Sequence, residues 1–255
     1  MISRRTLQGR TALITGASRG IGLAIAQALA RQGCNLAITG REKKALLAAE
    51  RRLNRATPAE ACPEPAEGAP ATQLLTQICD VRDAQSVKTL LAAIKKKFRR
   101  LDLLINNAGI SHAMAEVERL PLATWREVID TDLTGMFLVT QAALPLMRRG
   151  ATIVNNLSLA ATRVFAGQSA YCAAKHGALG LTRTLREELR PRGIRVIALL
   201  PGATSTDIWN QFWPEAPRQR MLRPETVAQA VVDALLLPPE STVEEVTLMP
   251  TKGTL

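Results

Sequence analysis

The stretch TGASRGIG, residues 15–22, decides the fold of this chain. It follows a short apolar run at residues 11–15 and precedes residues 21–32, where apolar side chains recur at helical spacing. Glycines at such a junction let the backbone turn sharply and approach a ligand, and the helix N-terminus offers free N–H groups to phosphate. The spacing is GxxxGxG rather than the GxGxxG of many dinucleotide-binding turns. It predicts a pyrophosphate site formed by Gly16, Ser18, Arg19, Gly20, Ile21 and Gly22.

The remaining chain repeats the alternation of strand and helix patterns. Further strands are expected at residues 36–39, 75–79, 101–105, 153–157 and 196–200, with helical patterns at 43–53 and 84–98. Such alternation favours parallel pairing, so we predict an α/β protein with a doubly wound parallel sheet, the Rossmann fold. The count of elements fits one domain over residues 1–255. Residues 54–72, rich in proline, alanine and glutamate, interrupt the alternation and are expected to form an inserted loop.

Composition and charge restrict the class of protein. No apolar run approaches the roughly 20 residues that span a bilayer, so no membrane segment is expected. The four cysteines, at positions 34, 62, 79 and 172, have neither paired nor metal-ligand spacing, which favours reduced thiols in a cytoplasmic protein without a metal site. The net charge of +11 is scattered over helix faces without aromatic interleaving, so nucleic acid is not an expected partner. An acidic substrate carrier, or a generally basic proteome, explains the charge equally well.

The end of the second expected strand bears on cofactor choice. NAD enzymes with this architecture place an acidic residue there to bind the ribose 2′-OH. Here the residues are Thr39, Gly40 and Arg41, and Arg19 lies in the glycine turn. Two guanidinium groups suit a 2′-phosphate, which favours NADP(H). The alternative is that both arginines are simply solvated.

Ser158, Tyr171 and Lys175 carry the chemistry. Positions four apart share one face of a helix, so the Lys175 ammonium is expected near the Tyr171 phenol. A unit charge at ~4 Å contributes roughly 4 kcal/mol at an effective dielectric constant of ~20, enough to move a phenol pKa by about three units towards neutrality. Tyr171 would then act as general acid or base, and Ser158 would hold the substrate carbonyl.

Together these features resemble the short-chain dehydrogenase/reductase family over residues 7–238. The resemblance implies that Ser158, Tyr171 and Lys175 are catalytic and that Tyr171 and Lys175 also touch the cofactor. It further implies cofactor contacts from Asp80-Val81, from Asn107, Ala108 and Gly109 of an NNAG segment, and from Pro201, Gly202, Thr204 and Thr206 of a PGxxxT segment.

The sequence departs from the family at two places. The family's fourth catalytic residue is an asparagine that acts through its backbone carbonyl, and Asp132 replaces it here. The backbone carbonyl survives this change, but the carboxylate could pair with Lys175 and weaken its effect on Tyr171. We therefore expect an active enzyme with an altered pH profile. The C-terminal residues 243–255 retain an expected strand at 246–249 but lack the Gly-Gly pair of many relatives, including the 3-oxoacyl-carrier-protein reductases.

Residues 203–224 correspond to the family's substrate lid. Trp209, Phe212 and Trp213 have the spacing of one helix face, and Phe165 lies between Ser158 and Tyr171. These four aromatic residues are expected to cover an apolar pocket for a hydrophobic ketone or acyl chain; equally, the lid helix could pack against the core or a partner subunit. The resemblance also implies a homotetramer or homodimer built through helices at residues 134–148 and 170–190.

The leading hypothesis is therefore an NADPH-dependent oxidoreductase acting on a small-molecule ketone or a 3-oxoacyl substrate. One alternative is an NADP-dependent dehydrogenase of a hydroxy acid or secondary alcohol. Another is a cofactor-binding regulator that has lost turnover; the replacement of the family's catalytic asparagine by Asp132 is the feature that raises this alternative.

Overall fold

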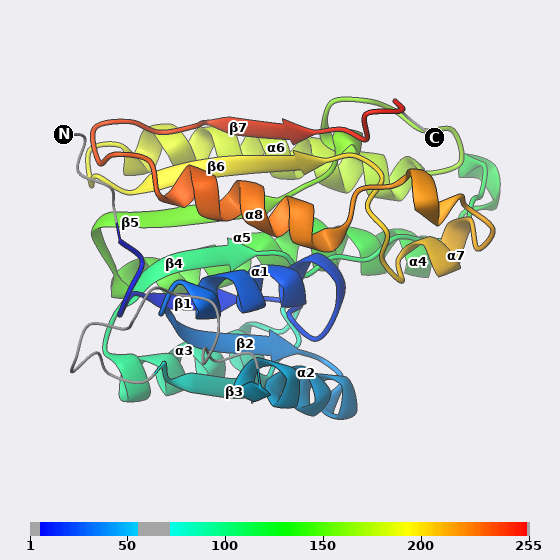
Figure 1. The fold of residues 1–255 in the computed structure, drawn as a ribbon. Coiled ribbons are helices and arrows are strands. Elements are labelled where there is room, and N and C mark those ends of the chain that lie inside the picture. Colours follow the sequence, from blue (N-terminus) through cyan, green and yellow to red (C-terminus); the bar gives the residue numbers. More distant parts are fainter. Residues whose placement is uncertain (1–5, 56–71, 254–255) are drawn as a thin grey trace.

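A seven-stranded parallel sheet forms the centre of the molecule in the computed structural model, which describes residues 6–55 and 72–253 (Figure 1). The strand order is β3-β2-β1-β4-β5-β6-β7, so the chain winds outward in both directions from β1 and β4. This is the predicted doubly wound α/β fold. The strands are β1 (Thr11–Ile14), β2 (Asn35–Gly40), β3 (Leu74–Ile78), β4 (Leu101–Asn106), β5 (Met147–Asn156), β6 (Arg195–Pro201) and β7 (Glu245–Leu248).

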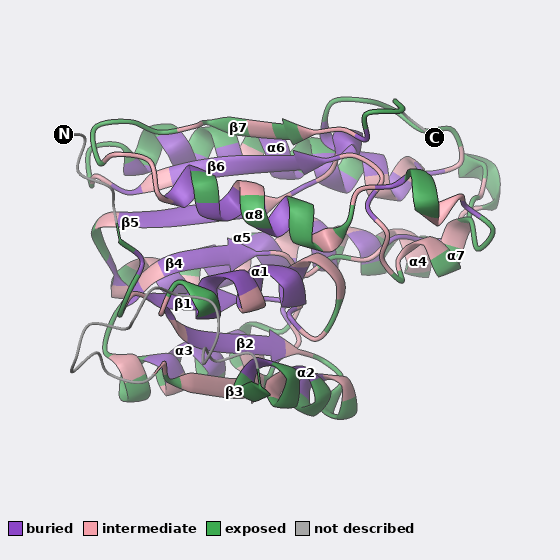
Figure 2. Cartoon of the chain, viewed as in Figure 1, coloured by how far each residue is buried: buried purple, intermediate pink, exposed green. Residues whose placement is uncertain are grey.

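Burial of the strands explains their composition. Every residue of β1 is buried, as are most residues of β4, β5 and β6, because helices cover both faces of a parallel sheet (Figure 2). The edge strands β3 and β7 are only partly covered. Short apolar runs in the sequence thus mark the centre of the sheet.

Helices form two layers around the sheet. One face packs against α1, α2 and α8, through residues such as Leu29, Leu46 and Val231, and the other against α3, α5 and α6, through Leu90, Val139 and Leu185. The helices are α1 (Gly20–Arg31), α2 (Lys43–Arg55), α3 (Ala84–Phe98), α4 (Leu122–Ile129), α5 (Gly135–Ala143), α6 (Ser169–Leu189), α7 (Trp209–Phe212) and α8 (Pro224–Leu235). A π-helical turn (Asp130–Thr134) joins α4 to α5, and short 3₁₀ helices span Val117–Arg119, Leu144–Leu146, Leu159–Ala161 and Arg218–Arg220. No helix within the described ranges is long and apolar enough to cross a membrane.

The structure differs from the sequence-based elements in one connection. The helix expected at 134–148 ends at Ala143, and a 3₁₀ turn containing Pro145 leads into β5 at Met147. Proline supplies no backbone N–H and ends the helix. The expected C-terminal strand is confirmed as β7, which pairs with β6. The inserted loop expected at 54–72 lies almost wholly outside the described residues, as does Cys62, while Cys34, Cys79 and Cys172 are buried free thiols.

Candidate active site

A cavity of about 960 Å³ opens at the carboxyl ends of the strands. Its walls come from the segments that follow all seven strands, on the side of the sheet where α4 and α7 lie in Figure 1. The strand order reverses between β1 and β4, and ligands of doubly wound sheets bind at such a reversal. Nearly every site residue expected from the sequence lines this cavity; the exceptions are Gly22 and Asp80.

In the turn after β1, Gly16 and Gly22 lie too close to neighbouring atoms to carry a side chain. Gly16 has φ +62°, and a Cβ there would lie 2.8 Å from Ala108 Cα. A Cβ on Gly22 would lie 2.3 Å from Asn107 Nδ2 and 2.5 Å from the carbonyl oxygen of Gly16. Gly22 therefore shapes the turn from behind, without lining the cavity.

The residues after β4 hold that turn in place. Asn107 donates from Nδ2 to the carbonyl oxygens of Thr15 (2.9 Å) and Gly16 (3.0 Å). Thr15 Oγ1 accepts from the backbone N–H groups of Asn107 (2.9 Å) and Ala108 (3.0 Å). From β5, Asn156 Nδ2 donates to Asn107 Oδ1 at 2.8 Å. The ends of three strands are thereby fixed together around the N-terminus of α1.

Basic side chains surround one end of the cavity. Arg19 and Arg41 both line it and are 65% and 46% exposed. Their ion pairs are long, 3.8 Å to Asp207 and 3.6 Å to Glu127, so neither guanidinium is tightly held.

Asp80 and Val81 divide their roles. Val81 lines the cavity, whereas the Asp80 carboxylate accepts from Arg82 Nε (3.0 Å) and Nη2 (2.6 Å). The hydrogen bonds from Arg82 lower the pKa of Asp80 below its usual value. Any contact of this pair with a cofactor from within the cavity would therefore fall to Val81.

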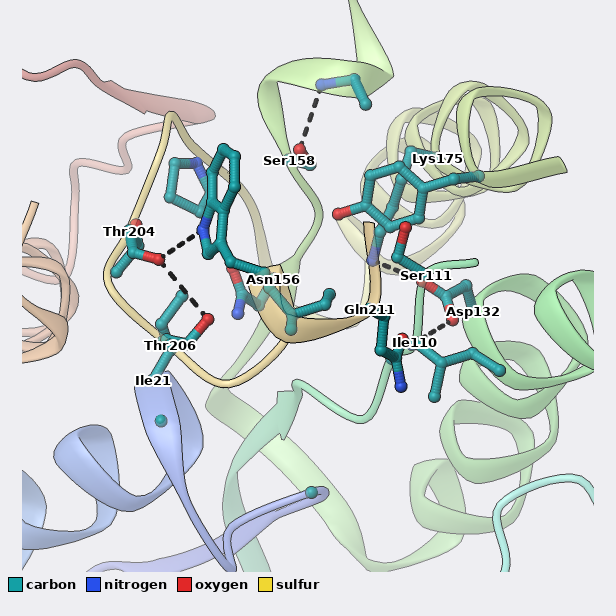
Figure 3. A pocket seen from close by; sticks show the side chains of 18 of the residues that line it. Ile21, Ile110, Ser111, Asp132, Asn156, Ser158, Lys175, Thr204, Thr206 and Gln211 are labelled. Carbon is teal, nitrogen blue, oxygen red and sulfur yellow. Dashed lines mark hydrogen bonds and ion pairs between the residues drawn. The ribbon is translucent and has the colours of Figure 1, made fainter. Parts of the chain in front are cut away.

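Ser158, Tyr171 and Lys175 all line this cavity, and Figure 3 shows Ser158 and Lys175 on its wall. Ser158 directly follows the turn out of β5, and its Oγ accepts from the backbone N–H of Ala160 at 3.1 Å. Because Oγ is the acceptor in this hydrogen bond, the hydroxyl hydrogen is not used by it and can point into the cavity. Tyr171 and Lys175 lie one turn apart on α6, with Lys175 Nζ 5.4 Å from the centre of the Tyr171 ring.

The Asp132 carboxylate pairs with Lys175, the alternative raised by the sequence. Lys175 Nζ lies 2.9 Å from Asp132 Oδ2, and the two side chains are 6% and 0% exposed. Asp132 Oδ1 accepts from the backbone N–H of Ile110 at 2.8 Å. A Cβ on Gly109 would come within 3.0 Å of Asp132 Oδ2, so the backbone after β4 closes over the pair.

This pair changes the electrostatics expected for Tyr171. Burial raises the pKa of Tyr171, and the charge of Asp132 adds to that effect, while Lys175 and the Ser158 hydroxyl oppose it; the net direction is upward. The expectation that Lys175 brings the phenol towards neutrality is thus wrong here, because it left out burial; the opposing effect of the Asp132 carboxylate was raised by the sequence. Burial disfavours the charged ammonium, but Asp132 and Tyr171 outweigh it and raise the pKa of Lys175. Burial also raises the pKa of Asp132, against the pull of Lys175.

The lid forms one wall of the cavity. Its two ends are joined by a bridge between Thr204 and Leu222, and Trp209 Nε1 donates to the carbonyl oxygen of Thr204 at 2.9 Å. The ring of Trp209 lies 4.8 Å from that of Phe212 and 6.2 Å from that of Trp213. All three rings line the cavity, as does Phe165 from the opposite side, so the lid aromatics face the site as well as one another.

Several lining residues were not expected from the sequence. They are Glu42, Cys79, Ile110, Ser111, Met114, Asn156, Leu157, Leu159, Ala160, Val164, Ala166, Gln168, Ala203, Asp207, Ile208, Gln211 and Met249, besides Gly40 and Thr131. Most directly follow β4, β5 or β6, so the rule that ligands bind at carboxyl ends could have indicated them as a group. It could not have indicated Met249, because only the return of β7 beside β6 brings the C-terminal segment to the site.

Comparison with known proteins gives a consistent result. The sequence model of the short chain dehydrogenase family matches residues 10–217. The chain is 37% identical to a 3-oxoacyl-[acyl-carrier-protein] reductase of Synechocystis, over 88% of each protein. It is 32% identical to levodione reductase of Leifsonia aquatica, over 96% of this chain and 93% of that protein. Among solved structures, an alcohol dehydrogenase from the archaeon Thermococcus sibiricus, complexed with 5-hydroxy-NADP, superposes with a TM-score of 0.83 at 30% identity, covering 96% of this chain and 97% of that one.

Proposed function

The chain belongs to the short-chain dehydrogenase family, and from this premise we propose that it is an NADPH-dependent oxidoreductase acting on the carbonyl/alcohol pair of a ketone or 3-oxoacyl substrate. One observation carries the proposal. A single cavity brings the glycine turn after β1 together with Ser158, Tyr171 and Lys175.

The residues around the turn fit a dinucleotide. No side chain caps α1, and its first turn contains no acidic residue, so the N–H groups at its N-terminus are available to a pyrophosphate. Gly16 and Gly20 keep the backbone there free of Cβ atoms. The buried Asn156 Oδ1 lies at the cavity without a hydrogen-bond donor from the described residues, and a cofactor N–H group would satisfy it.

Arg19 and Arg41 support the preference for NADP(H). Their exposed, long ion pairs cost little to exchange for a 2′-phosphate, which offers stronger charge-assisted hydrogen bonds. Gly40 occupies the last position of β2, where an acidic residue would bind a free 2′-OH; the carboxylate of Glu42 follows only after Arg41. Solved relatives bound to NADP or NADPH support the same choice.

In the proposed mechanism, bound NADPH supplies the hydride to the carbonyl carbon. Ser158 donates its hydroxyl hydrogen to the carbonyl oxygen and orients it. Tyr171 donates the phenolic proton to that oxygen as it becomes an alcohol. The raised pKa of Tyr171 keeps the phenol protonated at neutral pH, which suits carbonyl reduction better than alcohol oxidation. Lys175 stabilises the phenolate left after proton transfer, and Asp132 holds the lysine as a positioning residue.

Turnover by the purified chain tests this function. NADPH consumption would be followed against a panel of ketones and 3-oxoacyl thioesters, with NADH in parallel. We expect turnover that prefers NADPH and disappears in Tyr171→Phe, which removes only the hydroxyl. NADPH binding with no turnover on any substrate would contradict the proposal and favour the cofactor-binding regulator.

We propose a homotetramer or homodimer built through α5 and α6. Phe137 on α5 is 43% exposed, and a Cβ on Gly180 of α6 would meet no other atom within 4 Å, as at a surface that a partner could cover. The mass in solution, from light scattering, tests this. The free thiols of Cys34, Cys79 and Cys172 support a reducing, cytoplasmic environment.

A further inference from the structure

We infer that the substrate of this site is an uncharged ketone with a bulky apolar body, rather than an oxo acid, a hydroxy acid or a polyhydroxylated ketone. The inference rests on the proposed function, because it concerns what binds beside Ser158 and Tyr171. It follows from the charge, hydrogen bonding and exposure of the cavity wall opposite the glycine turn.

Three chain segments build that wall, which we call the substrate half. They are residues 110–116 after β4, residues 159–168 after β5 and the lid at 203–213 after β6, with Met249 beside them. The first two segments are tied by a bridge between Ala115 and Gln168, in which the Ala115 N–H donates to the Gly167 carbonyl oxygen at 3.0 Å. The bridge between Thr204 and Leu222 holds the base of the third. The three segments of the substrate half therefore lie beside one another at the carboxyl ends of the adjacent strands β4, β5 and β6.

Among the described residues, no cationic side chain of the substrate half lines the cavity; Arg163, in the segment after β5, is exposed and does not line it. The charged residues that line the cavity are Arg19, Arg41, Glu42, Asp132, Lys175 and Asp207. Arg19, Arg41 and Glu42 belong to the segments after β1 and β2, and Asp207 is turned towards Arg19. Lys175 is committed to Asp132 at 2.9 Å. A carboxylate placed beside the half-buried ring of Phe212 would lose water without gaining a cation, which disfavours binding.

Two internal polar side chains of this wall, those of Ser111 and Gln168, already have hydrogen-bond partners within it. Ser111 Oγ donates to Gln168 Oε1 at 2.8 Å, and Gln168 Nε2 donates to the carbonyl oxygen of His112 at 2.9 Å. Both side chains are buried, 7% and 5% exposed. Beyond Thr206, the lid residues with polar groups free for a substrate that line the cavity are Asp207, which faces Arg19, and Gln211, labelled in Figure 3. A row of hydroxyl groups would find few partners there.

The mouth of the cavity is apolar and open to water. Met114, Val164, Phe165 and Trp213 line it and are 58%, 80%, 43% and 41% exposed. Exposed apolar surface of this extent beside a cavity marks a place where apolar ligand surface replaces water. The body of the substrate would therefore extend from the reacting carbonyl towards these side chains.

A pair of substrates that differs by one carboxylate tests the inference. We would compare 4-phenyl-2-butanone with its para-carboxylate and with erythrulose as the polyhydroxylated ketone. The neutral arene should have a kcat/KM at least about 100-fold above either competitor, because each of them leaves polar groups unpaired on an apolar wall. Equal or higher kcat/KM for the carboxylate or for erythrulose would overturn the inference while leaving NADPH-dependent carbonyl reduction intact.

Substitution of Val164 sharpens the comparison. Val164 is 80% exposed, so Val164→Lys should leave folding intact and place one cation at the mouth. The ratio of kcat/KM for the neutral arene to kcat/KM for its para-carboxylate should fall by up to about 5-fold in Val164→Lys. The uncharged control Val164→Gln should leave this ratio unchanged. A preference unchanged by Val164→Lys would argue against binding of the arene at this mouth.

A binding measurement separates this inference from the proposed function. Trp209 and Trp213 line the cavity, so their fluorescence reports ligand binding to the NADP⁺ complex without turnover. Selective quenching by the neutral ligand in a protein that reduces no ketone would support the substrate class and overturn the proposed activity. Quenching that favours the carboxylate would overturn the substrate class regardless of turnover.

Discussion

Replacement of Asp132 by asparagine isolates the electrostatic effect of its carboxylate. The amide keeps the size of the side chain and an oxygen that can accept from Lys175 or from the Ile110 N–H, but it removes the negative charge. The Lys175 ammonium would then act on the Tyr171 phenolate without the opposing charge of Asp132, although burial would still disfavour the phenolate. We expect the pKa of Tyr171 to fall relative to the parent protein.

The geometry sets the size of this effect. Lys175 Nζ lies 5.4 Å from the Tyr171 ring centre, where a unit charge stabilises a phenolate by about 3 kcal/mol at an effective dielectric constant of about 20. Asp132 Oδ2 is 2.9 Å from Nζ and so no more than about 8.3 Å from the ring, where its charge offsets about 2 kcal/mol of that stabilisation. Loss of the carboxylate should therefore move the pH–rate midpoint to lower pH by about one to one and a half units.

The assay is the pH dependence of kcat/KM in both directions. Reduction needs the protonated phenol, so its rate in Asp132→Asn should decline at a lower pH than in the parent; oxidation needs the phenolate, so its rate should rise at a lower pH. Asp130→Asn is the matched control, because it removes the same charge from an exposed position two residues away and should leave both midpoints unmoved. If the midpoints of Asp132→Asn coincide with those of the parent, the carboxylate has no electrostatic influence on Tyr171 and the reasoning is refuted.

Three further perturbations have defined outcomes. Gly22→Ala places a Cβ 2.3 Å from Asn107 Nδ2, so it should lower the free energy of unfolding by about 2–3 kcal/mol and abolish NADPH binding. Gly180→Ala has open space in α6, so it should raise the free energy of unfolding by about 0.5–1 kcal/mol. Denaturant melts check both variants, and a cofactor titration checks NADPH binding. Arg41→Ala should raise the KM for NADPH at least about 10-fold and leave that for NADH unchanged, and equal effects on the two cofactors would argue against 2′-phosphate recognition. Arg82 lowers the pKa of Asp80, so the stability contributed by this partly exposed pair is present above the ordinary aspartate pKa and is lost as pH falls through the lowered pKa. In urea melts, Asp80→Asn should therefore reduce the free energy of unfolding by about 1 kcal/mol or less at pH 7 and leave it unchanged in strong acid. A reduction that persists in acid would contradict the ion pair as its source.

Local patterns in the sequence were enough for the architecture and for the reacting groups. The apolar runs that became β1, β4, β5 and β6 could only be buried strands, because each is short and lies between helical patterns. The turn at residues 15–22 needed glycines wherever the backbone approaches Asn107 and Ala108. Tyr171 and Lys175 share one face of any helix that contains both, since a separation of four residues fixes their relative direction on a helix.

Tertiary structure decided what depends on distance between remote segments and on exclusion of water. The sequence raised a pairing of Asp132 with Lys175, but only the fold buries Tyr171, which reverses the direction expected for its pKa, and only the fold holds the two charges 2.9 Å apart beside it. Likewise, no local pattern could show that Met249 reaches the cavity lining. Desolvation and contact between distant segments are properties of the assembled sheet, because the chain alone fixes which groups are present but not which of them water can reach.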